Sequence, residues 1–161
     1  MVERVPMSKT GHNKLREELV RLERKDRIEV IDAIKEARGH GDLKENAEYH
    51  AAKERQGYVE SRIMELKDKL GRAEVIDCSQ VAGDNVVFGV AVTVIDIDTD
   101  EEMSYQLLGP EEADIKQGTV SVLSPWGRAM LGKKPGDEVQ VKTPGGVRQL
   151  EVIEINKGKI V

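Results

Sequence analysis

The sequence predicts an α+β protein, in which an N-terminal antiparallel α-helical coiled-coil hairpin precedes a C-terminal α+β domain. Apolar residues recur at helical spacing through the first half, and no proline interrupts residues 12–73. Short strand-like runs separated by turn residues fill the second half. The change of pattern predicts two domains, residues 1–77 and residues 78–161.

The first helix is expected from about His12 to Arg38. Its apolar residues form two stripes with steps of three and four, and the second stripe is shifted in phase from the first. The stripes are Leu15, Leu19 and Leu22, followed by Val30, Ile34 and Ala37. One helix with a stutter between the stripes accommodates both.

The second helix is expected from about Leu43 to Ala73, and it has the more regular pattern. Its seam consists of Tyr49, Ala52, Gln56, Val59, Ile63, Leu66, Leu70 and Ala73. Alternating steps of three and four are typical of a helix that packs against a partner helix. The simplest partner is the first helix, although a dimerisation arm or a spacer has the same pattern.

The predicted tip of the hairpin, residues 39–45, contains two acids, Asp42 and Glu45. Their D-x-x-E spacing before a helix is that of a capping box, which would satisfy free backbone N–H groups. The apolar pair that usually accompanies such a box is missing, because Gly41 and Asn46 occupy its positions. The other interpretation is that both carboxylates point outward and share one hard cation, with further ligands supplied from elsewhere.

Basic side chains surround the tip, and two interpretations remain open for them. They are Arg38, His40, Lys44, Lys53 and Arg55. They are suited to contact a phosphate backbone at close range, but solvated charges on a helix surface have the same pattern.

Five strand-like runs follow in the second half, and they predict a small half-wrapped sheet. They are Val86–Val94, Met103–Leu108, Thr119–Leu123, Glu138–Val141 and Gln149–Ile155. A short helix with a Ser cap and Pro at its first position is expected at residues 124–131, and a hairpin turn at residues 144–146. Asp96, Asp98 and Asp100 begin like a calcium loop, but the residues required later are absent, so we expect an acidic bend.

The composition limits the classes of function. The chain has 161 residues, 39% hydrophobic and 34% charged, with a formal net charge of -5, which disfavours non-specific DNA binding. No apolar run approaches the ~20 residues that span a bilayer, and the single cysteine, Cys78, has no partner for an internal disulfide. We therefore expect a cytoplasmic protein with no membrane partner.

The segment EARGHGDLKENAEYHAAKE, residues 36–54, resembles the tip signature of the Gre family of bacterial transcript cleavage factors, in its GreA type. The resemblance extends over nearly the whole chain. Further matching segments are Pro6-Met7, residues 14–19, Val75-Ile76-Asp77, Leu123-Ser124-Pro125 and residues 134–139.

The resemblance implies an FKBP-like C-terminal domain that docks at the rim of the RNA polymerase secondary channel, while the hairpin enters that channel. It implies that Asp42 and Glu45 are the catalytic acids and metal ligands, which hold Mg²⁺ jointly with the polymerase and not stably in the free protein. It also implies basic residues that face the 3′ end of the nascent RNA, namely Arg38, Lys44 and Lys53. Docking is expected at Ser124, Pro125 and Trp126, and the chain is expected to be a monomer.

The implied function is stimulation of the polymerase's own cleavage of backtracked RNA, without catalysis by the chain alone. The alternatives are an inhibitory homologue that occupies the same channel, a structural coiled-coil adaptor, and a free-standing Mg²⁺ nuclease. A prolyl isomerase is a further alternative. Phe88, Tyr105 and Trp126 are the only aromatic residues of the second half, and we expect them to be too few to line an apolar substrate pocket.

Overall fold

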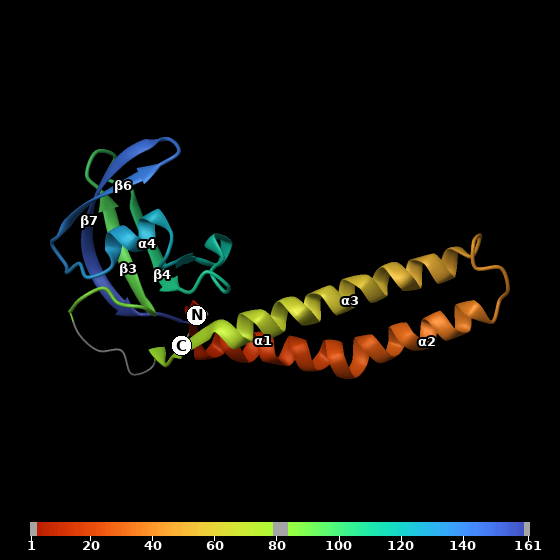
Figure 1. Ribbon diagram of the computed structural model, residues 1–161. Helices are drawn as coiled ribbons and strands as arrows, with labels where there is room; N and C mark the ends of the chain where they lie inside the picture. Colours follow the sequence, from red (N-terminus) through yellow and green to blue (C-terminus); the bar gives the residue numbers. More distant parts are fainter. Residues whose placement is uncertain (1–2, 79–83, 160–161) are drawn as a thin grey trace. The chain divides into compact units, whose positions relative to one another are not determined.

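The structure is a computed structural model that describes residues 3–78 and 84–159. Residues 13–72 form one compact unit, and residues 1–12 together with 73–161 form the other. The N-terminal strand therefore belongs to the same unit as the second half of the chain, whereas the predicted boundary after residue 77 places it with the hairpin. The predicted α+β class, with a helical hairpin and a separate sheet, is confirmed (Figure 1).

The first arm of the hairpin is continuously helical, in agreement with the predicted single helix. It consists of α1 (Lys9–Arg21), a π-helical turn η1 (Leu22–Asp26) and α2 (Arg27–Arg38). Leu22 and Val30 are one residue further apart than the seven of a heptad. Since a π turn holds one residue more than an α turn, η1 absorbs the extra residue and keeps both side chains on the buried face.

The second arm is α3 (Ala47–Arg72), and its predicted seam faces the first arm. The packed core of the hairpin consists of Leu22, Val30, Ile34, Ala52, Val59, Ile63 and Leu66. The predicted start of this helix, about Leu43, was wrong, whereas the predicted end, about Ala73, agrees within one residue. It begins at Ala47 because Asn46 caps it, and it ends at Arg72 because Ala73 enters a strand.

A parallel pair of short strands, β1 (Val5–Ser8) and β2 (Ala73–Ile76), was missed by the sequence prediction. Ser8 is fully buried, and its backbone N–H donates to Glu112 Oε2 at 2.6 Å. Its hydroxyl donates to Glu112 Oε1 and accepts from the Gly11 N–H at 3.0 Å. The signal for these strands is weak because their sequences, VPMS and AEVI, do not alternate apolar and polar residues.

The second unit is built on a five-stranded sheet in the order β5-β4-β3-β7-β6. Its strands are β3 (Val90–Asp96), β4 (Glu102–Leu108), β5 (Thr119–Ser121), β6 (Glu138–Thr143) and β7 (Gly146–Lys157). All neighbours are antiparallel except β4 and β5. The five predicted strands are confirmed, with ends shifted by a few residues, and the acidic bend and the turn at residues 144–146 form the hairpins as predicted.

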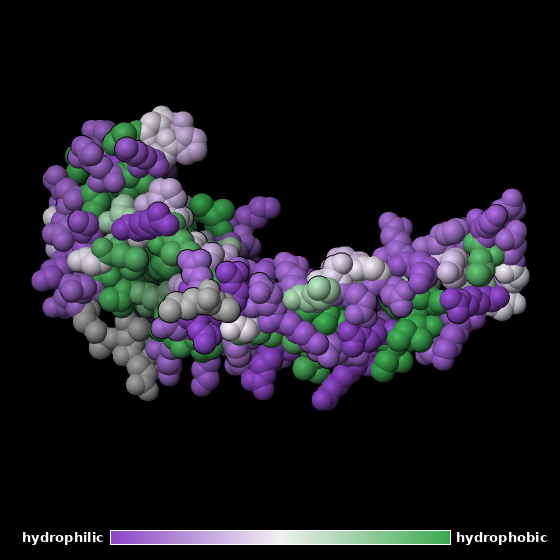
Figure 2. All heavy atoms as spheres, viewed as in Figure 1, coloured by the Kyte–Doolittle hydropathy of each residue, from purple (hydrophilic) through white to green (hydrophobic). Residues whose placement is uncertain are grey.

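A short helix, α4 (Pro125–Met130), packs against the concave face of this sheet (Figure 1). Ser124 caps it, and Pro125 is its first residue, as the sequence predicts. A 3-10 turn, η3 (Ile115–Gln117), precedes β5. In Figure 2 the visible face of the hairpin is mostly hydrophilic, with separate hydrophobic patches along it.

No helix within the described ranges is both long enough and apolar enough to cross a membrane. The longest helix, α3, carries charged residues throughout its length. Its apolar side chains are instead buried against the first arm of the hairpin.

Candidate functional site

The loop between α2 and α3 contains the predicted acids and begins where α2 ends, at Arg38. The Gly39 N–H donates to the carbonyls of Glu36 at 3.1 Å and Lys35 at 3.3 Å, which closes the last turn of the helix. Gly41 then has a φ of 109°, in the region that side chains with a Cβ rarely adopt. Glycine at this position lets the chain reverse within a few residues.

Asn46, and not Asp42, caps α3. Its Oδ1 accepts the Tyr49 N–H at 3.0 Å, which is the bond expected of a cap to the third residue of a helix. Asp42 Oδ1 accepts instead from the Lys44 N–H at 2.9 Å, in a local turn four residues before Asn46. The capping-box interpretation of Asp42 and Glu45 is therefore wrong.

Both acids are exposed to solvent at the hairpin tip. In the described part of the chain, no hydrogen bond or ion pair holds the Glu45 carboxylate, and Asp42 uses only one oxygen. Together with His40, Asn46 and Glu48 they line a shallow depression. Oxygen atoms of this kind are the ligands that Mg²⁺ prefers.

Two carboxylates do not complete a metal site. Among the described residues, no group of three or more His, Cys, Asp or Glu side chains is placed to hold a metal ion. Mg²⁺ takes six ligands in a near-ideal octahedron, and it usually retains several waters beside one or two protein carboxylates. The two tip carboxylates therefore fit the ligand chemistry of Mg²⁺ but do not by themselves make up an octahedral site.

The basic residues near the tip differ in how they are held. Arg38 and Lys44 are exposed at the end of α2 and within the loop. Lys53 Nζ donates to Gln56 Oε1 at 3.2 Å on the surface of α3. Arg55 instead pairs with Glu29 of α2 at 3.5 Å, so it contributes to the hairpin's own surface.

The second unit contains an apolar cavity of about 490 Å³, and all three predicted docking residues line it. Trp126 lies edge-on to Tyr105, with ring centroids 5.2 Å apart at 80°. Ser124 Oγ accepts the Gly127 N–H at 3.1 Å and donates to the Ser121 carbonyl at 2.6 Å, while Pro125 is exposed.

The expectation that the second half has too few aromatic residues to line an apolar pocket was wrong. Aliphatic and sulfur-containing side chains supply most of the wall beside Tyr105 and Trp126. They include Met103, Ile115, Val120, Val141 and Leu150. These side chains come from four separate strands and from η3, so the sequence does not show that they line one cavity.

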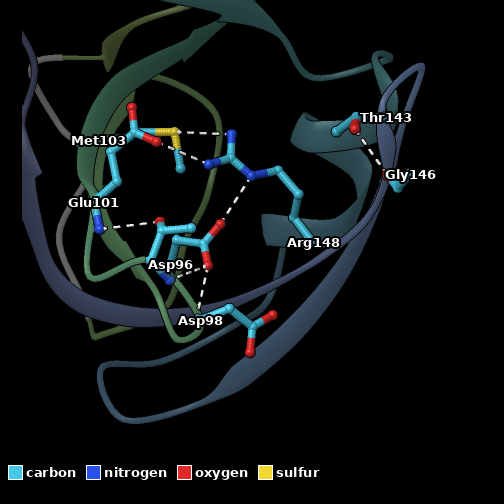
Figure 3. A network of polar contacts seen from close by, with 8 residues as sticks. Asp96, Asp98, Glu101, Met103, Thr143, Gly146 and Arg148 are labelled. Atoms are coloured by element: carbon cyan, nitrogen blue, oxygen red, sulfur yellow. Dashed lines mark hydrogen bonds and ion pairs between the residues drawn. The ribbon is translucent and has the colours of Figure 1, made fainter.

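A network of polar contacts fixes the edge of this cavity (Figure 3). Arg148 Nε donates to Asp96 Oδ2 at 2.8 Å, and Arg148 Nη2 donates to Glu101 Oε2 at 2.9 Å. Burial opposes ionisation of Asp96, but the Arg148 hydrogen bond and the N–H groups of Asp98 and Thr99 lower its pKa below the usual range. Arg148 is thus held against the β3–β4 turn.

Comparison with known protein families decides the identity of the chain. Residues 5–75 match the family described as "Transcription elongation factor, N-terminal", and residues 80–157 match "Transcription elongation factor, GreA/GreB, C-term". The chain belongs to the GreA/GreB family of transcription elongation factors.

Full-length relatives agree with this GreA/GreB assignment. The chain is 65% identical over 158 residues to "Transcription elongation factor GreA" of Desulfotalea psychrophila, covering 98% of both chains. It is 55% identical to the protein of the same name from Phenylobacterium zucineum, covering 96% of this chain and 98% of the relative. These matches confirm the predicted GreA type.

Among solved structures, the chain is similar to the "GreA factor homolog 1 (Gfh1) protein of Thermus thermophilus". The two are 29% identical, with 96% of this chain and 99% of the other covered, and the TM-score is 0.44.

Sequence reasoning about this GreA/GreB chain missed the roles of three residues that shape the two sites. They are Asn46 at the tip, and Tyr105 and Arg148 at the cavity. An Asn directly before a helical run is a cap signal, and the D-x-x-E pattern beside it obscured that signal. Arg148 and Asp96 are far apart in sequence, so only the pairing of β3 with β7 brings them together.

Proposed function

We propose that this chain binds bacterial RNA polymerase and stimulates the polymerase's own cleavage of backtracked RNA, which rescues arrested complexes. The observation that carries the proposal is the exposure of Asp42 and Glu45 at the hairpin tip, where neither caps α3. The Glu45 carboxylate and the second carboxylate oxygen of Asp42 make no bond within the described residues, so they are available to a metal centre in another protein. Membership of a family of transcription elongation factors supports that partner.

In this proposal the hairpin enters the secondary channel of the polymerase. Asp42 and Glu45 add oxygen ligands to a Mg²⁺ ion that the polymerase alone holds weakly. Held there by Asp42, Glu45 and the polymerase, Mg²⁺ would supply an attacking water of lowered pKa. Hydrolysis of an internal phosphodiester adds one water and leaves a new 3′-hydroxyl at the polymerase active centre.

The basic residues have a separate role in the proposal. Arg38 and Lys44 are exposed beside the acids, and Lys53 lies one to two turns into α3. Their charges would hold the phosphates of the extruded RNA 3′ end near the carboxylates. This arrangement offsets repulsion between the acidic tip and the RNA.

The apolar cavity beside α4 is the proposed docking site at the rim of the channel. Pro125 is exposed at its mouth, and Trp126 and Tyr105 form part of its wall. Aromatic residues in a concave apolar site are typical anchors of protein interfaces. We propose that the chain docks as a monomer.

We do not expect the chain to cleave RNA by itself, because two carboxylates on an exposed loop hold Mg²⁺ weakly and exclude no water. An RNA incubated with the chain and Mg²⁺ alone should remain intact. Cleavage in that experiment would support the free-standing nuclease instead.

The decisive experiment uses stalled, backtracked elongation complexes with the parent chain, Asp42→Asn and Glu45→Gln. Both variants should lose stimulated cleavage while they still compete with the parent chain for polymerase. Equal rescue by Asp42→Asn would exclude the metal role. Inhibition by the parent chain would favour the inhibitory homologue.

The apolar cavity also favours a second candidate, a prolyl isomerase. Its wall of Tyr105, Trp126 and aliphatic side chains is suited to a proline ring. An isomerisation assay on proline peptides distinguishes the two, since docking alone predicts the uncatalysed rate.

A further inference from the structure

The side chain of Asn46 joins the two helices of the hairpin at the tip. Its Nδ2 donates to the Ala37 carbonyl of α2 at 2.7 Å, and its Oδ1 accepts from the Tyr49 N–H of α3 at 3.0 Å. The orientation of the amide group is fixed by its partners, because a carbonyl only accepts and a backbone N–H only donates. One side chain therefore bridges the last turn of α2 and the first turn of α3.

The bridge is sheltered, unlike the loop that it closes. Ala37 is 2% exposed and Asn46 is partly buried, whereas every residue from Arg38 to Glu45 is exposed. Since water competes less for a sheltered bond, the bond between Asn46 and Ala37 constrains the loop more strongly than an exposed contact would. Asn46 also follows Glu45 directly in the chain.

Within the closed loop, the contacts are exposed and mostly local, apart from His40 Nε2, which lies 4.0 Å from Glu48 Oε2 of α3. Asp42 Oδ1 accepts from the Lys44 N–H at 2.9 Å, and His50 Nε2 lies 3.0 Å from the Lys44 carbonyl. Both contacts are exposed and fix only the backbone near Lys44. The loop's two ends are held together by the packing of α2 against α3 and, nearest the tip, by the bridge through Asn46.

We propose that Asn46 is a positioning residue, whose bridge between Ala37 and Tyr49 holds the loop so that the Asp42 and Glu45 carboxylates reach one Mg²⁺ ion together. The inference rests on the proposed function. Residues that orient metal ligands typically change metal affinity or activity by about 10- to 100-fold when they are replaced. Without the bridge, the loop would have to be ordered each time the ion binds, which weakens binding.

Substitutions at Asn46 separate the bridge from the helix cap. Asn46→Ser keeps an oxygen that caps α3 but is too short to reach Ala37. Asn46→Asp keeps the cap at the original size but replaces the N–H donor with an oxygen that the Ala37 carbonyl repels. Glu54→Gln, on the exposed surface of α3, is the matched control.

The test measures stimulated cleavage by backtracked complexes over a range of Mg²⁺ concentrations, with docking competition and thermal melting of each full chain. For Asn46→Ser we expect the half-saturating Mg²⁺ concentration to rise about tenfold, with the rate recovering at high Mg²⁺ and docking unchanged. Asn46→Asp should also require more Mg²⁺, and Glu54→Gln should match the parent.

The inference is overturned if Asn46→Ser follows the parent's Mg²⁺ curve. It is also overturned if the lost activity is matched by lost docking or a lower melting temperature, because the bridge would then only stabilise the fold. Failure of the proposed function looks different: Asp42→Asn would retain full cleavage, or the parent chain would not stimulate cleavage.

Discussion

Arg62 of α3 donates two parallel hydrogen bonds to Glu18 of α1, from Nε to Oε1 at 2.8 Å and from Nη2 to Oε2 at 3.0 Å. Both side chains are about a quarter exposed, so water screens the pair only in part. Arg62 also contacts Glu65 at 3.0 Å on its own helix. The pair ties the two arms together beside the apolar seam.

Acid should weaken the hairpin through this pair. The Arg62 hydrogen bond lowers the pKa of Glu18 below its ordinary value of 4.5, so the contribution to stability is complete above that pH and is lost as the pH falls through the lowered pKa. Glu18→Gln should cost about 1 kcal/mol at neutral pH and should flatten the decline below pH 4.5. Urea unfolding followed by helical circular dichroism at several pH values measures both effects.

Truncation of the hairpin core should have a larger effect that does not depend on pH. Leu66 is 0% exposed and lies in the cluster between the two arms. Leu66→Ala should destabilise the hairpin by about 2–5 kcal/mol through lost burial and a cavity. Met64→Ala on the same helix, where Met64 is 72% exposed, is the control and should change stability by less than about 0.5 kcal/mol. Similar melting of the two variants would contradict the packing of the seam.

The free chain should bind Mg²⁺ only weakly. Asp42 and Glu45 offer two carboxylates, and no further His, Cys, Asp or Glu among residues 3–78 and 84–159 joins them to form a closed site. Calorimetric titration of the chain with Mg²⁺ should give no saturable binding below millimolar concentrations, and a chelator should leave its melting temperature unchanged. A tight site in the free protein would mean that the tip needs no partner to complete its coordination.

Neutralising the basic residues near the tip should weaken contacts with the RNA phosphates without removing metal binding. Arg38→Gln, Lys44→Gln and Lys53→Gln should each slow stimulated cleavage several-fold. Cleavage stimulated by the parent chain should also slow as the salt concentration rises, because salt screens these charges. Arg55→Gln is the matched control, because Arg55 pairs with Glu29. If all four variants behave alike, these charges are only a solvated helix surface.

Docking should depend on Pro125 and Trp126 in different ways. Pro125 is exposed, so Pro125→Ala should weaken competition for polymerase with little change in melting temperature. Trp126→Ala also removes the edge-on contact with Tyr105, and it should cost about 3–5 kcal/mol of stability in addition to docking. Unchanged competition by Pro125→Ala would move the docking surface away from the mouth of the cavity.

The sequence by itself determined the hairpin, the five strands of the sheet and the capped helix α4. These elements follow from local patterns, namely helical spacing of apolar residues, alternating strands, and Ser-Pro at a helix start. The stutter between Leu22 and Val30 was also visible, and the structure resolves it as the π turn η1. The two acids of the tip were identified by their residue type and by resemblance to a family.

Only the tertiary structure decided which residue caps α3 and what surrounds the acids. Two local patterns predicted different caps for α3, namely the D-x-x-E box that begins at Asp42 and the single Asn46 before the helix. The hydrogen bond from Asn46 to Ala37 on the other helix favours the Asn46 cap. The apolar cavity and the Arg148–Asp96 contact likewise depend on strands that are distant in sequence. Local spacing specifies elements because it acts within a few residues, whereas a site assembled across elements depends on how the chain folds back on itself.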